Sequence, residues 1–437
     1  MKTSAGHTYP RHPLKFCGPL DVRHHYVGAP TISEVDEVRE HRSITDHPFR
    51  RPVSARRLLK VAWSGEALTA TEFMEKTGFT RATVLSACRE LVEAGWFKKE
   101  ADARAAGEYT KGRPALRHTF RPDAAFVVAG DADEDMFTVA VADLHGVERS
   151  RVALKVSSLR QAAQRRRTLK QLVEEALEAA NVPAERVAAV TLGVPAPVDT
   201  RGSSPPPDGR EHYWPTVNPD FASLFQDKGW AVRLDNDANL GALCESTDGA
   251  GVGVRSFATL LSAERFGAGI VVDGRLLRGA RGGVGEMRIL DMVMGVEAPH
   301  GLERRARWEM RQLDEKNQLV GELASIPPEK RDALAVFRAA ERHDTTALEV
   351  VDALAERLAR VVRLLSELLD LDRIIIAGAI APSVGPLLQR TREILQREPT
   401  QRCAELFASQ HGADIVLRGA ITSAIIDVRK RALLEEE

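Results

Sequence analysis

The stretch that most constrains the fold is LDNDANLGALCE, residues 234–245. A short apolar run ends at an amide and a carboxylate, Asn236 and Asp237, and a helix-like run follows. Asx side chains are favoured at such a junction because they cap helices, so capping alone would explain Asp237 and Asn239. A carboxylate in this position can also take a proton from a bound hydroxyl. The stretch therefore predicts a β-turn-α unit of an α/β fold that carries either a ligand site or a capped helix.

The length and the cysteine pattern limit the classes of protein to which the chain can belong. A chain of 437 residues should fold as two or three domains with a large core. Its four cysteines show no CxxC spacing, which argues against a disulfide framework or a structural zinc site. No apolar run reaches the roughly 18–20 residues that span a bilayer, and the N-terminus lacks a signal-peptide core. We therefore expect a cytoplasmic protein without a membrane segment.

The net charge of -1 hides an uneven distribution of charged residues. Residues 48–121 carry 15 Lys and Arg against 8 Asp and Glu, whereas residues 122–437 carry 40 against 48. A basic module beside an acidic body is typical of nucleic-acid binding through one domain. Chance variation in solvated surface is the other explanation of the same imbalance.

The N-terminal third predicts an extension followed by a small helical domain. Residues 1–47 lack a sustained period and are expected to form a flexible extension. Within residues 48–121 a first helix begins near Ser54, and a capping box of Thr69 and Glu72 opens a second. Gly78 supplies a turn, and Thr80 caps a third helix over residues 81–94. This order is that of a helix-turn-helix domain.

The third helix should present two different faces. Val84, Cys88 and Leu91 share one stripe and should pack inward, so the other face is polar. The strand-like segments 96–100 and 114–120 then enclose a polar loop that is interpreted as a wing. In such a domain the third helix enters the major groove of DNA and the wing contacts phosphates. The candidate DNA contacts are Thr80, Arg81, Thr83, Ser86, Arg89, Lys111 and Arg113.

Residues 122–437 predict a larger α/β body with two lobes around a cleft. A β-meander over residues 125–156 precedes a helix, and strands followed by glycines recur with crossover helices in both halves. Near the C-terminus we expect a strand at RIIIAG, helices at about 383–396 and 400–408, a strand at DIVLRG and a final helix.

Taken in order, residues 54–430 resemble the ROK family of repressors, open reading frames and sugar kinases. This resemblance implies the actin-like, hexokinase-like two-lobed ATPase fold. A winged helix-turn-helix ahead of such a body is the layout of the family's transcriptional repressors rather than of its plain kinases.

The resemblance also implies a sugar site. DNDAN matches the family's ENDAN, so Asn236 would bind a sugar hydroxyl and Asp237 would correspond to the catalytic base. The segments GARGGVGEM and HGLE imply Glu286 and Glu303 as further sugar contacts. Ile289 replaces the family's histidine, and the cysteines that bind zinc in many members are absent, so no metal is expected.

The segments that match the family's ATP site depart from its pattern. The first phosphate loop, DIGGT in the family, is DADED at residues 131–135. The second phosphate segment is AERFGAG at residues 263–269, and the adenosine segment is AGA at residues 377–379. Replacing glycines by acids removes close access to backbone N–H groups and places negative charge near a triphosphate.

The sequence as a whole therefore predicts a sequence-specific DNA-binding transcriptional regulator, and a repressor in particular, with a catalytically inactive kinase-like body. Asp237 would be a vestigial base, and no cofactor is expected. The protein would bind a pseudo-palindromic double-stranded operator as a homodimer or tetramer, and its body would sense a sugar-like effector. Two alternatives stay open: an active ATP-dependent sugar kinase that uses Asp237 as base, and a ligand-independent regulator.

Overall fold

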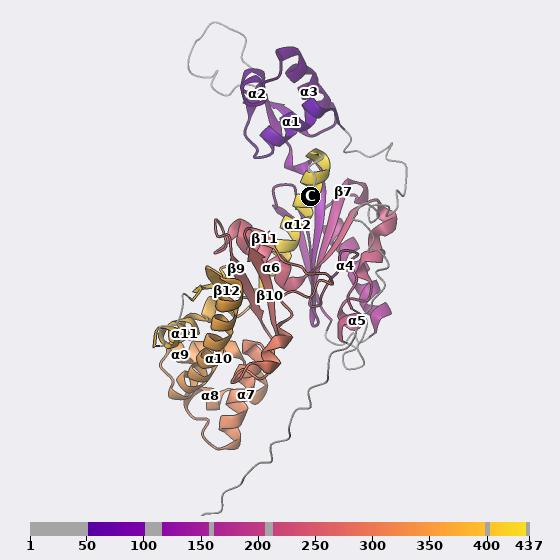
Figure 1. Cartoon of the computed structure of the whole chain (residues 1–437). Coiled ribbons are helices and arrows are strands. Elements are labelled where there is room, and N and C mark those ends of the chain that lie inside the picture. Colours follow the sequence, from indigo (N-terminus) through magenta and orange to yellow (C-terminus); the bar gives the residue numbers. More distant parts are fainter. Residues whose placement is uncertain (1–50, 101–115, 157–160, 206–212, 398–402, 434–437) are drawn as a thin grey trace, which may run out of the picture. The chain divides into compact units, whose positions relative to one another are not determined.

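The computed structural model describes residues 51–100, 116–156, 161–205, 213–397 and 403–433 (Figure 1). Its first part contains three helices and a small antiparallel sheet in the strand order β1-β3-β2. This order of helices and strands agrees with the one expected from the sequence for these residues. The helices are α1 (Val53–Ala62), α2 (Ala70–Thr77) and α3 (Arg81–Glu93), and the strands are β1 (Leu68–Thr69), β2 (Phe97–Glu100) and β3 (Arg117–Phe120).

Local signals fix the α2-turn-α3 unit. Thr69 and Glu72 form the expected capping box at the start of α2, and Gly78 ends that helix with a φ of 73°. This left-handed conformation suits glycine because it has no Cβ. The side chain of Thr80 then accepts the backbone N–H of Thr83 and so caps α3. These details confirm the helix order and the caps that the sequence predicts.

The body, residues 122–437, contains two five-stranded sheets, and the first begins shortly after strand β3. Its strand order is β6-β5-β4-β7-β8; β4, β5 and β6 are antiparallel, whereas β4, β7 and β8 are parallel. Val190 and Leu192 of β7 pack into the same core as Leu169 of α4 (Ala162–Ala179). The strands are β4 (Phe126–Ala132), β5 (Met136–Asp143), β6 (Glu148–Lys155), β7 (Val187–Val194) and β8 (Ala231–Asn236).

The second sheet has the order β11-β10-β9-β12-β13. Ile374 and Ile376 of β12 pack on a helical layer, whereas Ile375 lies on the opposite face with Ala242 of α6 (Asp237–Asp248). The strands are β9 (Phe257–Ser262), β10 (Phe266–Val272), β11 (Arg275–Leu276), β12 (Arg373–Ala377) and β13 (Glu405–Ala408). The remaining helices before α12 are α5 (Tyr213–Val217), α7 (Leu302–Glu315), α8 (Gly321–Ser325), α9 (Ala333–Glu341), α10 (Thr345–Leu369) and α11 (Gly385–Arg397).

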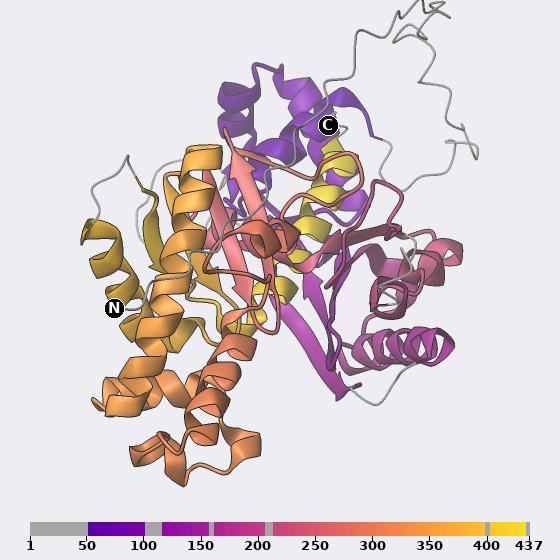
Figure 2. The ribbon, with the colours of Figure 1, turned by 60° about the horizontal axis from the view of Figure 1, so that its bottom comes forward.

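Two helices, α6 and α12 (Ile415–Leu433), lie between the two sheets (Figure 2). α12 packs on β4 and β7, and α6 packs on β9 and β10. Glycines permit close approach on both sides of α6: a Cβ at Gly419 of α12 would lie 2.0 Å from the Leu240 carbonyl oxygen, and one at Gly269 of β10 would lie 2.1 Å from that of Ala238. The start of α6 is therefore held between backbone contacts.

Two predictions near the C-terminus are wrong. A helix was expected at 400–408, but residues 405–408 form strand β13. They pair in parallel with β12 and so extend the sheet. The expected strand at DIVLRG is the start of α12 instead, because Ile415 and Leu417 are buried and Gly419 fits against the backbone of α6. The predicted extension at residues 1–47 lies outside the described part of the chain.

Candidate functional site

The exposed face of α3 is the first candidate site. Val84, Cys88 and Leu91 are at most 1% exposed and attach the helix to the domain core, as the sequence predicts. The opposite face leaves Arg81, Ala82, Leu85, Ser86 and Arg89 exposed. A short helix, a turn and a second helix with such a face are the parts that a helix-turn-helix uses to reach the major groove.

The structure places five of the seven predicted DNA contacts in this region. Arg81, Ser86 and Arg89 point away from the core, and Thr80 and Thr83 are joined by a hydrogen bond of 2.9 Å between their hydroxyl groups. The two threonines therefore stabilise the helix start as well as lying at its exposed end. Lys111 and Arg113 lie outside the described residues.

The second candidate site is the junction between β8 and α6. Asn236 is 8% exposed, and its side-chain oxygen accepts the backbone N–H groups of Ala238 at 3.0 Å and Asn239 at 3.2 Å. Its amide nitrogen donates to the Ala196 carbonyl oxygen at 3.1 Å and so ties α6 to the turn after β7. The residue that caps α6 is thus Asn236, and not Asp237 or Asn239 as the capping interpretation of the sequence expected.

Asp235, directly before this cap, organises the junction. Its buried carboxylate accepts the Asn236 backbone N–H at 2.9 Å and the Asn239 side-chain amide at 3.2 Å. Arg278, which follows β11, also donates to Asp235 and links the second sheet to the site. Neither the role of Asp235 nor that of Arg278 was predicted from the sequence. For Asp235 a signal was present, because its carboxylate directly precedes the Asn-Asp pair.

Asp237 lies at the first position of α6 among other acids. The pKa of Asp237 is raised to about 8, mainly by burial and also by the nearby carboxylates of Asp133 and Glu286, while the hydrogen bond from the Ala238 backbone N–H opposes the rise. At neutral pH this carboxyl is therefore mostly protonated. The effect of Glu286 on Asp237 shows that the structure brings these two predicted sugar contacts together.

Glu303, the remaining predicted sugar contact, is occupied within the second lobe. Its carboxylate accepts the Ala333 backbone N–H at 3.1 Å and the Arg307 guanidinium at 3.0 Å. These contacts cap the start of α9 and pair Glu303 with its own helix. Ile289, which stands where the family has histidine, is 45% exposed and lies in the short 3-10 helix Met287–Met292 that follows Glu286.

The loop between β4 and β5, residues 133–135, is held by an arginine of α4. Arg165 of α4 is 1% exposed and donates to the carbonyl oxygens of Asp133 at 2.7 Å and Glu134 at 2.9 Å. Its guanidinium also lies 4.7 Å from the ring centre of Phe137. Within the loop, the Asp133 carboxylate accepts hydrogen bonds from the backbone N–H groups of Glu134 and Asp135. The N–H groups that could face a phosphate are thus used by the loop itself.

The contact of Arg165 with this loop was not predicted from the sequence either. A signal was present, because Arg165 shares the i, i+4, i+7 stripe of Leu169 and Leu172, which are buried on the inner face of α4. Tyr213 was also missed: its pKa is raised by burial and by Glu134 and Asp237, which places the phenol beside the acids of the site.

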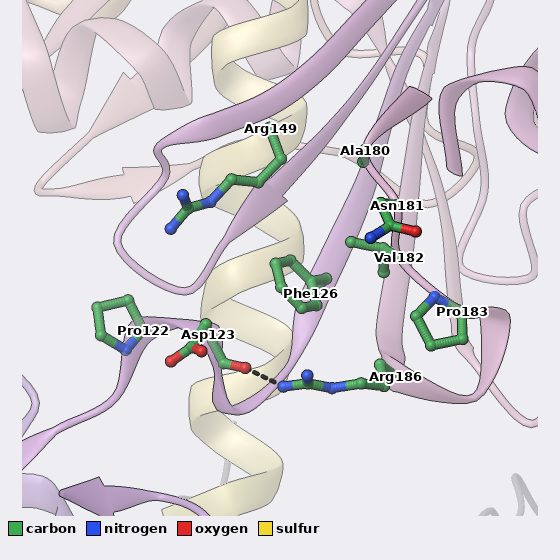
Figure 3. Close-up of a pocket in the computed structure, with 9 residues that line it drawn as sticks. All are labelled: Pro122, Asp123, Phe126, Arg149, Ala180, Asn181, Val182, Pro183 and Arg186. Carbon is green, nitrogen blue, oxygen red and sulfur yellow. Dashed lines mark hydrogen bonds between the residues drawn. The ribbon is translucent and has the colours of Figure 1, made fainter. Parts of the chain in front are cut away.

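A cavity of about 300 Å³ lies apart from both candidate sites (Figure 3). Arg186 lies over the Phe126 ring and donates to the Asp123 carbonyl oxygen, and Arg149 pairs with the buried Asp143 at 2.7 Å. Because both arginines that line this cavity are engaged within the chain, no ligand is assigned to it.

Within the described ranges no group of three His, Cys, Asp or Glu side chains is arranged to hold a metal ion. No helix in the same residues combines the length and the apolar character that a membrane crossing needs.

Relatives with known roles fall into two classes. A glucokinase of Halalkalibacterium halodurans is 28% identical over 200 residues, which cover 42% of this chain and 59% of the glucokinase. A xylose repressor of Caldicellulosiruptor bescii is 23% identical over 248 residues, which cover 55% of this chain and 59% of the repressor. The chain thus spans about three fifths of the length of each.

Solved structures share the fold. A ROK family transcriptional regulator, a homologue of the E. coli MLC protein, has a TM-score of 0.66 at 19% identity and covers 88% of this chain and 99% of its own. A ROK glucokinase from Streptomyces griseus, in complex with glucose and AMPPNP, has a TM-score of 0.54 at 20% identity and covers 69% and 99%. The ROK family model matches residues 131–425, more than half of the chain, and this protein therefore belongs to the ROK family.

Proposed function

We propose that this protein is a sequence-specific DNA-binding transcriptional regulator, acting as a repressor, with a kinase-like body that no longer transfers phosphate. The observation that carries the proposal is α3, whose buried stripe fixes the helix and whose exposed face presents Arg81, Ser86 and Arg89. The structural match to a ROK regulator extends over 88% of the chain, compared with 69% for the glucokinase. The difference between these two coverages is close to the share of the chain that residues 48–121, the proposed DNA-binding domain, make up.

The phosphate side of the body supports the loss of catalysis. Arg165 holds the carbonyl groups of the loop that precedes β5, and the acid at position 133 occupies the amides of that loop. An incoming triphosphate would meet carboxylates instead of free N–H groups.

The sugar side supports a sensing role. Asn236, Asp237 and Glu286 lie close together, and Glu303 is a further sugar contact in this proposal, available once its bonds to Ala333 and Arg307 open. A sugar-like effector bound here would act on DNA affinity only if it prefers one conformation of the body. As a homodimer the protein would present two copies of α3 to a pseudo-palindromic operator.

The proposal is tested by selecting operator sequences from random double-stranded DNA with the full chain and measuring affinity by fluorescence anisotropy. We expect selective binding that weakens steeply as salt rises, because phosphate contacts release counterions. Arg89→Ala should weaken binding by about tenfold or more, a loss typical of one good base or phosphate contact. Arg57→Ala, on the exposed face of α1, is the matched control. Absence of selective, salt-dependent binding would overturn the proposal.

An active sugar kinase is the second candidate, because the expected sugar contacts Asn236, Asp237 and Glu286 lie near one another. The discriminating measurement is release of ADP from ATP in the presence of a panel of hexoses. Turnover that disappears in Asp237→Asn would establish this alternative, whereas sugar binding without turnover supports the sensor.

A further inference from the structure

Leu85 is an apolar side chain on a face that is otherwise polar or small. It is 42% exposed, whereas the large apolar residues Val84 and Leu91 of the same helix are fully buried. Single exposed leucines are common on protein surfaces and by themselves need no explanation. Leu85 is distinguished by its position, because it occupies the centre of the face that the proposed function assigns to DNA.

The row that contains Leu85 has a defined spacing. Arg81, Leu85 and Arg89 are four residues apart along α3, so they lie on one side of the helix. A rise of about 1.5 Å per residue separates successive members by roughly 6 Å. One base step is about 3.4 Å, so two neighbouring members of the row are separated by roughly two base steps along a groove.

The side chains beside Leu85 leave it accessible. Ala82, three residues earlier on the same face, is exposed and has only a methyl group, and Ser86 is small. A helix with small residues around a projecting leucine can approach a flat surface closely. Leu85 would therefore make contact at its tip, with the two longer arginines reaching past it on either side.

We propose that Leu85 packs against the 5-methyl group of a thymine in each operator half-site, between the positions contacted by Arg81 and Arg89. Thymine is the base that presents a methyl group in the major groove, and apolar side chains are its usual partners. The contact removes apolar surface of both groups from water. This inference rests on the proposed DNA binding and adds a specific base to it.

The experiment uses the full chain and the operator obtained by selection. Each thymine of a half-site is replaced in turn by deoxyuridine, which keeps the base pair and its hydrogen-bonding groups but lacks the methyl group. Binding is measured by anisotropy at one fixed salt concentration. We expect one position per half-site at which the replacement weakens binding by about three- to tenfold, the effect of one buried methyl contact.

Variants of Leu85 connect the effect to this side chain. Leu85→Ala should weaken binding to thymine DNA by a similar factor and should show no further loss on the deoxyuridine site, which is the signature of a direct pair in a double-mutant cycle. Leu85→Met should retain most of the discrimination because it keeps an apolar tip. Leu154→Ala, at a leucine of β6 that is 46% exposed, is the control and should behave as the parent protein.

The outcomes separate this inference from the proposed function. If selection yields no operator, DNA binding and the thymine contact are both overturned. If an operator is found but contains no thymine in the half-site, or if the parent protein and Leu85→Ala lose the same factor on deoxyuridine, only the role of Leu85 is overturned. Circular dichroism of each variant checks that α3 stays folded.

Discussion

The β8–α6 junction and the β4–β5 loop, the proposed sugar side and phosphate side of the kinase-like body, are stabilised by opposite arrangements. On the sugar side, the side-chain oxygen of Asn236 accepts two backbone N–H groups and its amide donates to the Ala196 carbonyl oxygen. A residue expected to contact a ligand therefore also stabilises the start of α6. On the phosphate side, Arg165 and Asp133 satisfy the backbone of their loop internally. The difference teaches that a ligand site can persist where its residues are structural, whereas a site made of free backbone groups is closed by a few substitutions.

Removing Arg165 should give the largest effect. Arg165→Ala deletes two hydrogen bonds to carbonyl oxygens of the loop and leaves a cavity beside the Phe137 ring. We expect a loss of about 2–4 kcal/mol in the free energy of unfolding, measured by urea denaturation. Arg167→Ala, on the exposed side of the same helix, should change it by less than about 0.5 kcal/mol. Equal losses in the two variants would show that the loop does not depend on Arg165.

Asp237→Asn should change how the free energy of unfolding depends on pH. The pKa of Asp237 is about 8 in the folded protein, compared with about 3.9 in an unfolded chain. Between these values the folded state holds a proton that the unfolded state has released, so the stability of the parent protein falls as pH rises through this window. Asparagine cannot ionise. The variant's gain in stability over the parent protein should therefore grow up to about pH 8 and then level off.

Urea unfolding at several pH values measures this gain. Asp248→Asn provides the control, because Asp248 is at the other end of α6 with a side chain 77% exposed. A stability difference between Asp237→Asn and the parent protein that is the same at acidic and alkaline pH would contradict the raised pKa.

Asn236→Ala should give the smallest of these effects. It removes the cap of α6 and the tie to Ala196, for an expected loss of about 1 kcal/mol in the free energy of unfolding. Asn236→Ser keeps a capping oxygen but has no amide to donate. If Ser restores stability but not sugar binding in a calorimetric titration, the cap and the ligand role of Asn236 are distinct. Full retention of sugar binding in both variants would remove Asn236 from the proposed site.

The parts of the fold that were predictable from sequence are those that local chemistry determines. Thr69 with Glu72, Gly78 and Thr80 define α2 and α3 within a few residues of each other. By contrast, the strand at residues 405–408 exists because it pairs with β12, a partner about thirty residues away that no local pattern reveals. Sequence could place Asn236 beside Asp237, but it could not show that Asp133 and Glu286 approach Asp237 and raise its pKa.

The glycine contacts of α6 have a mechanical consequence. Gly269 and Gly419 bring β10 and α12 against the carbonyl groups of Ala238 and Leu240, so the helix is gripped by main chain and not by side chains that can change rotamer. A methyl group at either position would overlap a carbonyl oxygen and push β10 or α12 away from α6. The position of the helix that carries Asn236 and Asp237 therefore depends on the absence of a side chain at these two glycines.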